Sequence, residues 1–212
     1  MERLEFTLLT DGSSDAILLH PLRWLLEQHL NIPVEGTWAE LRLLPSPPSD
    51  LRSRIMKTLD LYPCDILFVH RDAEREPHPQ RVDEILAAAS EIADKAIPIV
   101  PVRMQEAWLL FDESAIRLAA GNPNGNVALG IPPLARLESL PNPKEVLHDL
   151  LVTATKYEGR RRKRFNPSRA AVRLGEILED FTPLRALPAF EDAERRIVRT
   201  LEGYFPTLVR KG

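Results

Sequence analysis

The sequence of 212 residues predicts an α/β fold, with a mostly parallel four-stranded sheet flanked by helices and a helical C-terminal part. Two observations lead to this class. Strand-like apolar runs alternate with segments of helical periodicity over residues 4–120, an order that favours a parallel sheet with helices on both faces. Residues 121–212 carry mostly helical patterns, and we expect them to form a lid or a second layer of the same domain.

Four short runs rich in apolar and β-forming residues are the predicted strands. They are Leu4–Thr10, Thr37–Leu44, Asp65–Val69 and Ala96–Val102. Pro98 and Pro101 interrupt the fourth run. Because proline cannot donate a ladder hydrogen bond, they favour a place at the sheet edge or at a strand end.

Seven segments repeat apolar residues at helical spacing. They cover residues 15–30, 50–61, 80–94, 104–120, 144–155, 169–181 and 189–205. Pro21 falls early in the first segment and predicts a separate or kinked first turn. The segment that begins at Met104 is expected to be a strong helix ending near Gly121, whereas residues 156–168 are expected to be basic and irregular.

Composition and motifs exclude several classes of protein. The net charge of −3 excludes a globally basic nucleic-acid coat, and the single cysteine, Cys64, excludes a disulfide framework or a cysteine-rich zinc module. No apolar run approaches the length of a membrane span, and the N-terminus shows no signal-peptide pattern, so we expect a cytoplasmic protein. The phosphate-binding loop of P-loop NTPases is also missing from the sequence.

Acidic side chains follow two of the predicted strands. Asp11 and Asp15 come after the first strand, and His70, Asp72 and Glu74 come after the third. Alternate residues leaving a strand point the same way, so the last three are expected to line one side of a pocket at the carboxyl ends of the strands. Carboxylates with an imidazole suit Mg²⁺ or Mn²⁺. Taken singly, each acid is as readily explained as a helix cap or a turn residue.

Three stretches resemble motifs of a known domain class. Asp-Gly-Ser-Ser-Asp at 11–15 resembles the Glu-Gly-x-[Ser/Thr]-[Asp/Glu] motif that opens Toprim domains, and His-Arg-Asp-Ala-Glu at 70–74 resembles their Asp-x-Asp motif. Residues 103–112, which contain Glu-Ala-Trp-Leu-Leu, are similar to a stretch of a Toprim-like family of uncharacterised bacterial proteins related to the OLD-type nucleases. The resemblance covers residues 4–155, which we expect to form a Toprim-like α/β domain. Residues 156–212 would then add a basic loop and C-terminal helices packed on it.

The resemblance implies bound Mg²⁺ or Mn²⁺ and cleavage of nucleic-acid phosphodiesters. It assigns metal-ligand positions to five residues and a charge-stabilising role to Lys144, which matches a late family lysine. The five are Asp11, Asp15, His70, Asp72 and Glu106, and Glu74 is a sixth candidate ligand from the alternation after the third strand. Asp11 would ligate the metal or act as the catalytic general base. Two departures, Asp11 in place of the family's Glu and His70 in place of its Asp, leave a single-metal or degenerate site as an alternative.

Five consecutive cations, at positions 160–164, form the second candidate site. Arg160, Arg161, Arg162, Lys163 and Arg164 stand between Tyr157 and Phe165, a pattern that grips a phosphate backbone and stacks bases. The alternative is a solvated or disordered loop, which such charge runs often form.

Three functions remain open from the sequence. The first is a stand-alone Toprim-like nuclease, with bacterial defence as a setting. The OLD-type nucleases carry an ATPase domain that this chain lacks, so such a nuclease would act alone or with a separate ATPase partner. The second is a non-catalytic Toprim-fold protein that binds nucleic acid or another partner. The third is a metal-dependent phosphatase for small molecules.

Overall fold

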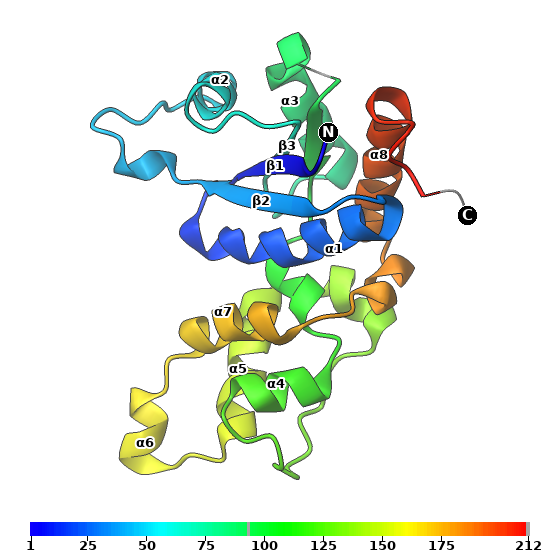
Figure 1. Ribbon diagram of the computed structural model, residues 1–212. Helices are drawn as coiled ribbons and strands as arrows, with labels where there is room; N and C mark the ends of the chain where they lie inside the picture. The colour runs from blue at the N-terminus through cyan, green and yellow to red at the C-terminus, as the bar shows by residue number, and fades with distance from the viewer. Residues whose placement is uncertain (93, 211–212) are drawn as a thin grey trace.

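The computed structural model describes residues 1–92 and 94–210, and it confirms the predicted fold class. Four strands, all parallel, form one sheet in the order β2-β1-β3-β4 (Figure 1). Their bounds are β1 Leu4–Leu9, β2 Val34–Ala39, β3 Ile66–His70 and β4 Ala96–Ile99. Because the strands are parallel, the residues that follow β1, β3 and β4 all leave the sheet at one edge.

Burial separates the central strands from the edges. Every residue of β3 is buried, as expected for a strand with helices on both faces, whereas β2 alternates between buried and exposed positions. Pro98 lies in β4, an edge strand, in register with Val69. The edge position predicted from the prolines is therefore confirmed.

The two faces of the sheet are covered by different helices, as Figure 1 shows. Helices α2 (Leu51–Leu61) and α3 (His78–Ala88) pack on one face, where Leu9, Leu67 and Val69 join their apolar residues in one cluster. Helices α1 (Leu19–His29) and α8 (Pro188–Tyr204) pack on the other, over Phe6, Leu8 and Phe68. Alternate strand residues thus serve opposite layers.

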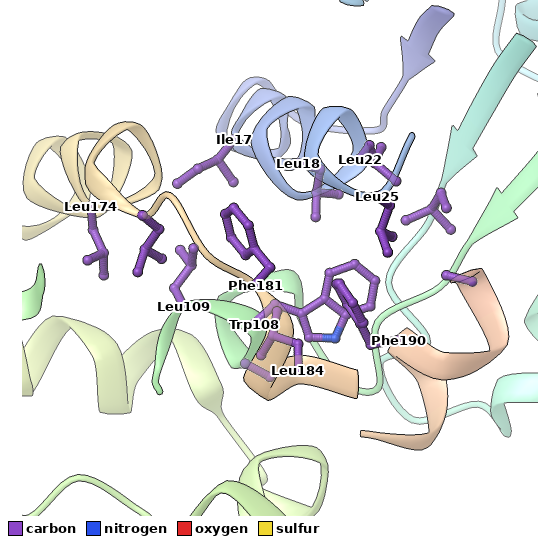
Figure 2. Close-up of a cluster of buried hydrophobic side chains, with 14 of the residues drawn as sticks. Ile17, Leu18, Leu22, Leu25, Trp108, Leu109, Leu174, Phe181, Leu184 and Phe190 are labelled. Carbon is purple, nitrogen blue, oxygen red and sulfur yellow. The ribbon is translucent and has the colours of Figure 1, made fainter. Parts of the chain in front are cut away.

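The second of these clusters continues away from the sheet into the C-terminal helices. It takes in apolar residues of α4 (Glu113–Ala119), α5 (Pro143–Thr155) and α7 (Pro167–Ile177). Figure 2 shows its centre, where Trp108 meets Phe190 edge-on at a centroid distance of 5.0 Å. The predicted division of the chain at residue 155 stays a prediction, although one continuous apolar cluster spans both parts.

The second strand begins three residues and ends five residues before the predicted bounds. It runs from Val34 to Ala39, and the chain then turns into the 3₁₀ helix η2 (Leu41–Leu43), where the Glu40 carboxylate accepts a hydrogen bond from the Arg42 N–H. Gly36 weakens the strand pattern in the sequence, yet the fold needs it, since a Cβ there would lie 2.2 Å from the Phe6 ring.

The helix predicted over residues 104–120 is two helices. The 3₁₀ helix η4 (Gln105–Leu109) comes first, and α4 begins after Asp112, whose side chain caps it by accepting the Ala115 N–H at 3.0 Å. The helix ends near Gly121 as predicted, with a left-handed φ of 78° at that residue.

Several other boundaries were also predicted wrongly: the helix predicted over residues 80–94 ends at Ala88, and the strand predicted to reach Val102 ends at Ile99. Residues 156–168 are not irregular: they contain α6 (Gly159–Arg164) and the start of α7, which Asn166 caps. The first helical segment is divided as Pro21 predicted, into η1 (Ser13–Leu18) and α1. The other 3₁₀ turns are η3 Ser90–Ile92, η5 Leu134–Ser139 and η6 Thr182–Ala186. Over residues 1–92 and 94–210, no helix combines the length and apolar character needed to cross a membrane.

Candidate functional site

Four of the predicted site residues come together at the carboxyl edge of the sheet. His70 is the last residue of β3, and its Nε2 lies 3.8 Å from Asp15 Oδ2 and 3.6 Å from Asp72 Oδ1. The Glu106 carboxylate is close enough to act electrostatically on both His70 and Asp72. Asp15 comes from η1 and Glu106 from η4, so residues far apart in the chain meet here because their elements follow β1 and β4.

The orientation of His70 is set by the neighbouring strand. Its Nδ1–H donates to the carbonyl oxygen of Ile99 at 3.0 Å, because that carbonyl can only accept. The side chain is 1% exposed, and burial lowers the pKa of the imidazole. The neutral ring therefore turns an unprotonated Nε2 toward the carboxylates of Asp15 and Asp72.

Three hydrogen-bond donors hold the carboxylate of Asp15. Its Oδ2 accepts the Gly12 N–H at 2.9 Å, and its Oδ1 accepts the Ser14 hydroxyl at 2.9 Å and the Gln105 side-chain amide at 2.8 Å. The bond to Gly12 gives Asp15 a structural role at the start of η1, as the helix-cap interpretation predicts. Besides the Gly12 N–H, Oδ2 has His70 Nε2 as a neighbour at 3.8 Å.

Asp72 has the most perturbed acid–base chemistry of the group. Burial, followed by the negative charges of Asp15 and Glu106, raises the pKa of Asp72 to about 8, although the Gln105 backbone N–H donates to it at 2.9 Å. Its side chain keeps 23% of its exposure to water. Around neutral pH this carboxyl group therefore holds a proton that a cation can displace.

Gln105 is a site residue that the sequence reasoning missed. Its backbone N–H binds Asp72, and its side-chain amide binds Asp15, so it ties the two acids together. The amide oxygen, Oε1, is buried and has no hydrogen-bond partner among the described residues. Its position beside Glu106 in the third motif was the one signal available, and an amide carries no charge pattern that would single it out.

Glu106 and Lys144 form the outer part of the site. Lys144 Nζ lies 3.2 Å from Glu106 Oε1, which is consistent with the prediction that this lysine stands beside the acids. Both residues, with Gln105 and His148, line a small cavity of about 60 Å³ that also touches α7. The Glu106 side chain is 7% exposed, whereas that of Lys144 is 44% exposed.

Two predicted ligands, Asp11 and Glu74, form no hydrogen bond or ion pair with this group among the described residues, although Asp11 acts electrostatically on His70 and Glu74 acts on Asp72. The carboxylate of Asp11, 45% exposed, forms ion pairs with Arg54 and Arg71. Burial favours its neutral form, but the two guanidinium groups outweigh it and hold the pKa of Asp11 below its ordinary value. Glu74 is exposed because the chain turns sharply there, with a φ of 52°, which breaks the alternation that the strand pattern predicted.

The side chains gathered around His70 are of the kinds that bind a divalent ion. Over residues 1–92 and 94–210, no three His, Cys, Asp or Glu side chains already stand in an arrangement that could hold a metal. The chemistry nevertheless fits, because Nε2 of His70 lies within 3.8 Å of an oxygen of Asp15 and of Asp72, and all three groups can donate lone pairs once a cation displaces the Asp72 proton. The unsatisfied Oε1 of Gln105 adds a neutral oxygen of the kind that Mg²⁺ and Mn²⁺ accept.

The basic run lies on another part of the molecule. Residues 160–164 fall within α6, and all five side chains are exposed. The guanidinium of Arg161 stands over the ring of Tyr157, 5.0 Å from its centroid, and Tyr157 meets Phe165 edge-on. The cations and aromatic rings that the sequence placed together are therefore neighbours in space.

Comparison of the chain with protein-family models, with curated proteins and with solved structures gives no match. The resemblance to Toprim domains therefore rests on the three motifs.

Proposed function

We propose that this protein hydrolyses phosphodiester bonds of nucleic acid with the help of Mg²⁺ or Mn²⁺ held by Asp15, His70, Asp72 and Glu106. One observation supports this most strongly: the imidazole nitrogen Nε2 of His70, which carries no proton, lies 3.6 Å from an oxygen of Asp72 and 3.8 Å from an oxygen of Asp15. Burial and the neighbouring acids keep a proton on Asp72 around neutral pH, and a divalent cation can take the place of that proton.

Each residue of the site would have a separate role in the reaction. A divalent ion held here supplies Lewis acidity and lowers the pKa of a coordinated water. The hydrogen bonds from Gln105 keep Asp15 and Asp72 in fixed positions, and the Ile99 carbonyl keeps the imidazole of His70 in the tautomer that can bind a cation. Lys144, next to Glu106, offers a positive charge to the phosphate oxygens as negative charge develops on them.

The same proposal implies particular binding partners and a cellular compartment. Nucleic acid would be the partner, since the exposed cations of α6 provide a surface for phosphates. The cytoplasm would be the compartment, and bacterial defence is a setting in which such an enzyme would work. A separate ATPase would be a further partner, because this chain lacks a P-loop motif.

A non-catalytic nucleic-acid-binding protein is the second candidate. It is favoured by Asp11, the residue expected to ligate metal or act as general base, because two arginines already neutralise its carboxylate. In that case the carboxyl edge of the sheet would bind no divalent ion.

Hydrolysis of bis(p-nitrophenyl) phosphate tests the proposal, because this small diester needs the metal site but no extended binding surface. We expect hydrolysis with Mn²⁺ that stops with EDTA and is lost in Asp72→Asn. Parallel reactions with p-nitrophenyl phosphate distinguish a phosphodiesterase from a phosphatase, because a phosphatase would prefer this monoester. No turnover of either compound at saturating Mn²⁺ would leave the non-catalytic candidate.

A further inference from the structure

A large open cavity lies beside the basic helix α6. It has a volume of about 830 Å³, within the usual range of about 300–1,000 Å³ for ligand sites. Four arginines line it, two from the basic run and two from α7: Arg161, Arg164, Arg169 and Arg173. Two members of the basic run, Arg161 and Arg164, therefore line the cavity together with two cations of α7.

The four arginines differ from most others in the part of the chain that the structure describes, because no carboxylate there pairs with them. Among the described residues, none of them forms an ion pair, although arginines elsewhere, such as Arg54 and Arg117, are paired with carboxylates. Glu176 is the one acid in the cavity lining, so the lining carries an excess of positive charge. Arginine binds phosphate oxygens through its planar fork of donors, so an anion with phosphate groups fits this lining.

The same cavity also presents aromatic and aliphatic surface. Tyr157 and Phe165 line it, with ring centroids 6.3 Å apart, and Phe165 is only partly buried. Val172 on α7 is 46% exposed where it borders the cavity. A ligand that combines phosphate with a flat apolar ring would satisfy both kinds of surface, and a nucleotide has this composition.

The cavity adjoins the acidic site across α7. Val172 lines both the large cavity and the small one that contains Glu106 and Lys144. The helix packs tightly on η1, because a Cβ on Gly175 would lie 2.1 Å from the Ile17 side chain. A chain of nucleotides held in the large cavity would therefore leave it over α7, next to the acids that we propose to hold the metal.

We infer that this cavity is a binding site for single-stranded nucleic acid, in which the four arginines hold the phosphates and Phe165 stacks on an unpaired base. The inference rests on the proposed function for its purpose, since it supplies the strand to be cut. A duplex is a poorer fit, because its bases are stacked on one another and cannot reach the aromatic rings.

The test is a binding measurement in EDTA, which keeps it independent of metal chemistry. Fluorescent oligothymidylate and oligouridylate of about twelve nucleotides are the probes, within the span of about 4–16 that single-strand sites cover. Comparison of the two probes shows whether the site binds DNA, RNA or both. An abasic oligomer of equal length and charge, and poly-glutamate, are the controls. We expect both nucleic acids, or one of them, to bind, and both controls to bind at least fivefold more weakly.

Two triple variants with the same loss of charge locate the site. Arg161→Gln/Arg164→Gln/Arg173→Gln should flatten the dependence of log affinity on log salt by about two units, since each phosphate contact on a single strand contributes about 0.7. The matched control, Arg75→Gln/Arg136→Gln/Arg199→Gln, removes three exposed cations that lie neither in α6 nor in the cavity lining and should leave the slope nearly unchanged. All six side chains are exposed, so both proteins should fold.

Phe165→Leu tests the stacking, because it keeps apolar volume while it removes the ring. We expect this variant to bind oligothymidylate about fivefold more weakly or worse and to bind the abasic oligomer as the native protein does. Equal losses in the two triple variants, or equal binding of the abasic oligomer and oligothymidylate, would overturn the inference. If hydrolysis of bis(p-nitrophenyl) phosphate is then still observed, the proposed function holds and only the inferred binding site is wrong. If single-stranded nucleic acid binds as expected but the diester is not hydrolysed, the binding site holds and the proposed function is wrong.

Discussion

Replacement of Asp72 by asparagine should stabilise the metal-free protein in a pH-dependent way. The pKa of Asp72 is raised from 3.8 to about 8, mostly by burial and further by the charges of Asp15 and Glu106. One pKa unit corresponds to about 1.4 kcal/mol, so the full shift is worth on the order of 5 kcal/mol. Because 23% of the Asp72 side chain remains exposed and water screens the repulsion, we expect about 2–3 kcal/mol in the free energy of unfolding.

The sign follows from proton binding in the two states. Between the ordinary pKa of 3.8 and the folded pKa of about 8, the folded protein keeps the Asp72 proton and the unfolded chain loses it. The stability of the native protein therefore falls as the pH rises through this window and levels off above it. Asparagine carries no proton to lose, and its Oδ1 can still accept the Gln105 N–H, so the advantage of the variant should grow from nothing at low pH to its full value above about pH 8.

Urea unfolding of both proteins at a series of pH values measures this difference without metal. Asp83→Asn, the same chemical change at an exposed position of α3, is the matched control and should show no such trend. An Asp72→Asn variant that is less stable than the native protein at high pH, or equally stable at all pH values, would refute the account of repelling acids in one site.

Three further variants test separate parts of the site. His70→Asn can keep the hydrogen bond to the Ile99 carbonyl while it removes Nε2, so it should weaken Mn²⁺ more than Mg²⁺ in a thermal-shift titration, since imidazole favours the later metal; equal weakening would contradict a ligand role. Lys144→Met should preserve the Mn²⁺-dependent rise in melting temperature and lower the rate of diester cleavage by about 10²-fold or more, and an unchanged rate would argue against charge stabilisation. Asp11→Asn should keep the Mn²⁺ shift and cost at most about 1 kcal/mol at neutral pH, because the Asp11 carboxylate is 45% exposed and water screens its ion pairs, and this cost should disappear as the pH falls below the ordinary carboxyl pKa; loss of the Mn²⁺ shift would restore Asp11 as a ligand.

The sequence predicted the sheet well because its signals there are local. The apolar run that ends at Val69 is uniform enough to predict a buried strand, and Pro98 predicted a place at the sheet edge or at a strand end. The errors came from backbone effects that no periodicity records. Gly36 lies inside β2 because the Phe6 ring requires the space, and Asp112 restarts a helix in a segment that looks continuous.

The candidate site was predictable in part for the same reason. Acids that follow strand ends were expected to meet, and Asp15, Asp72 and Glu106 do lie around His70. The ion pairs of Asp11 come from arginines on other elements, whose approach depends on the tertiary fold. The role of Gln105, and of Arg173 in the large cavity, likewise depends on which neighbours the fold supplies.

Anomalous scattering from crystals of the native protein soaked in Mn²⁺ tests the central claim most directly. We predict a peak at the carboxyl edge of the sheet, in contact with Asp15, His70 and Asp72, at oxygen and nitrogen distances of about 2.0–2.3 Å. The same soak of Asp72→Asn should show no such peak. A native crystal at saturating Mn²⁺ with no peak at these residues would contradict the proposal that this edge of the sheet is a metal site.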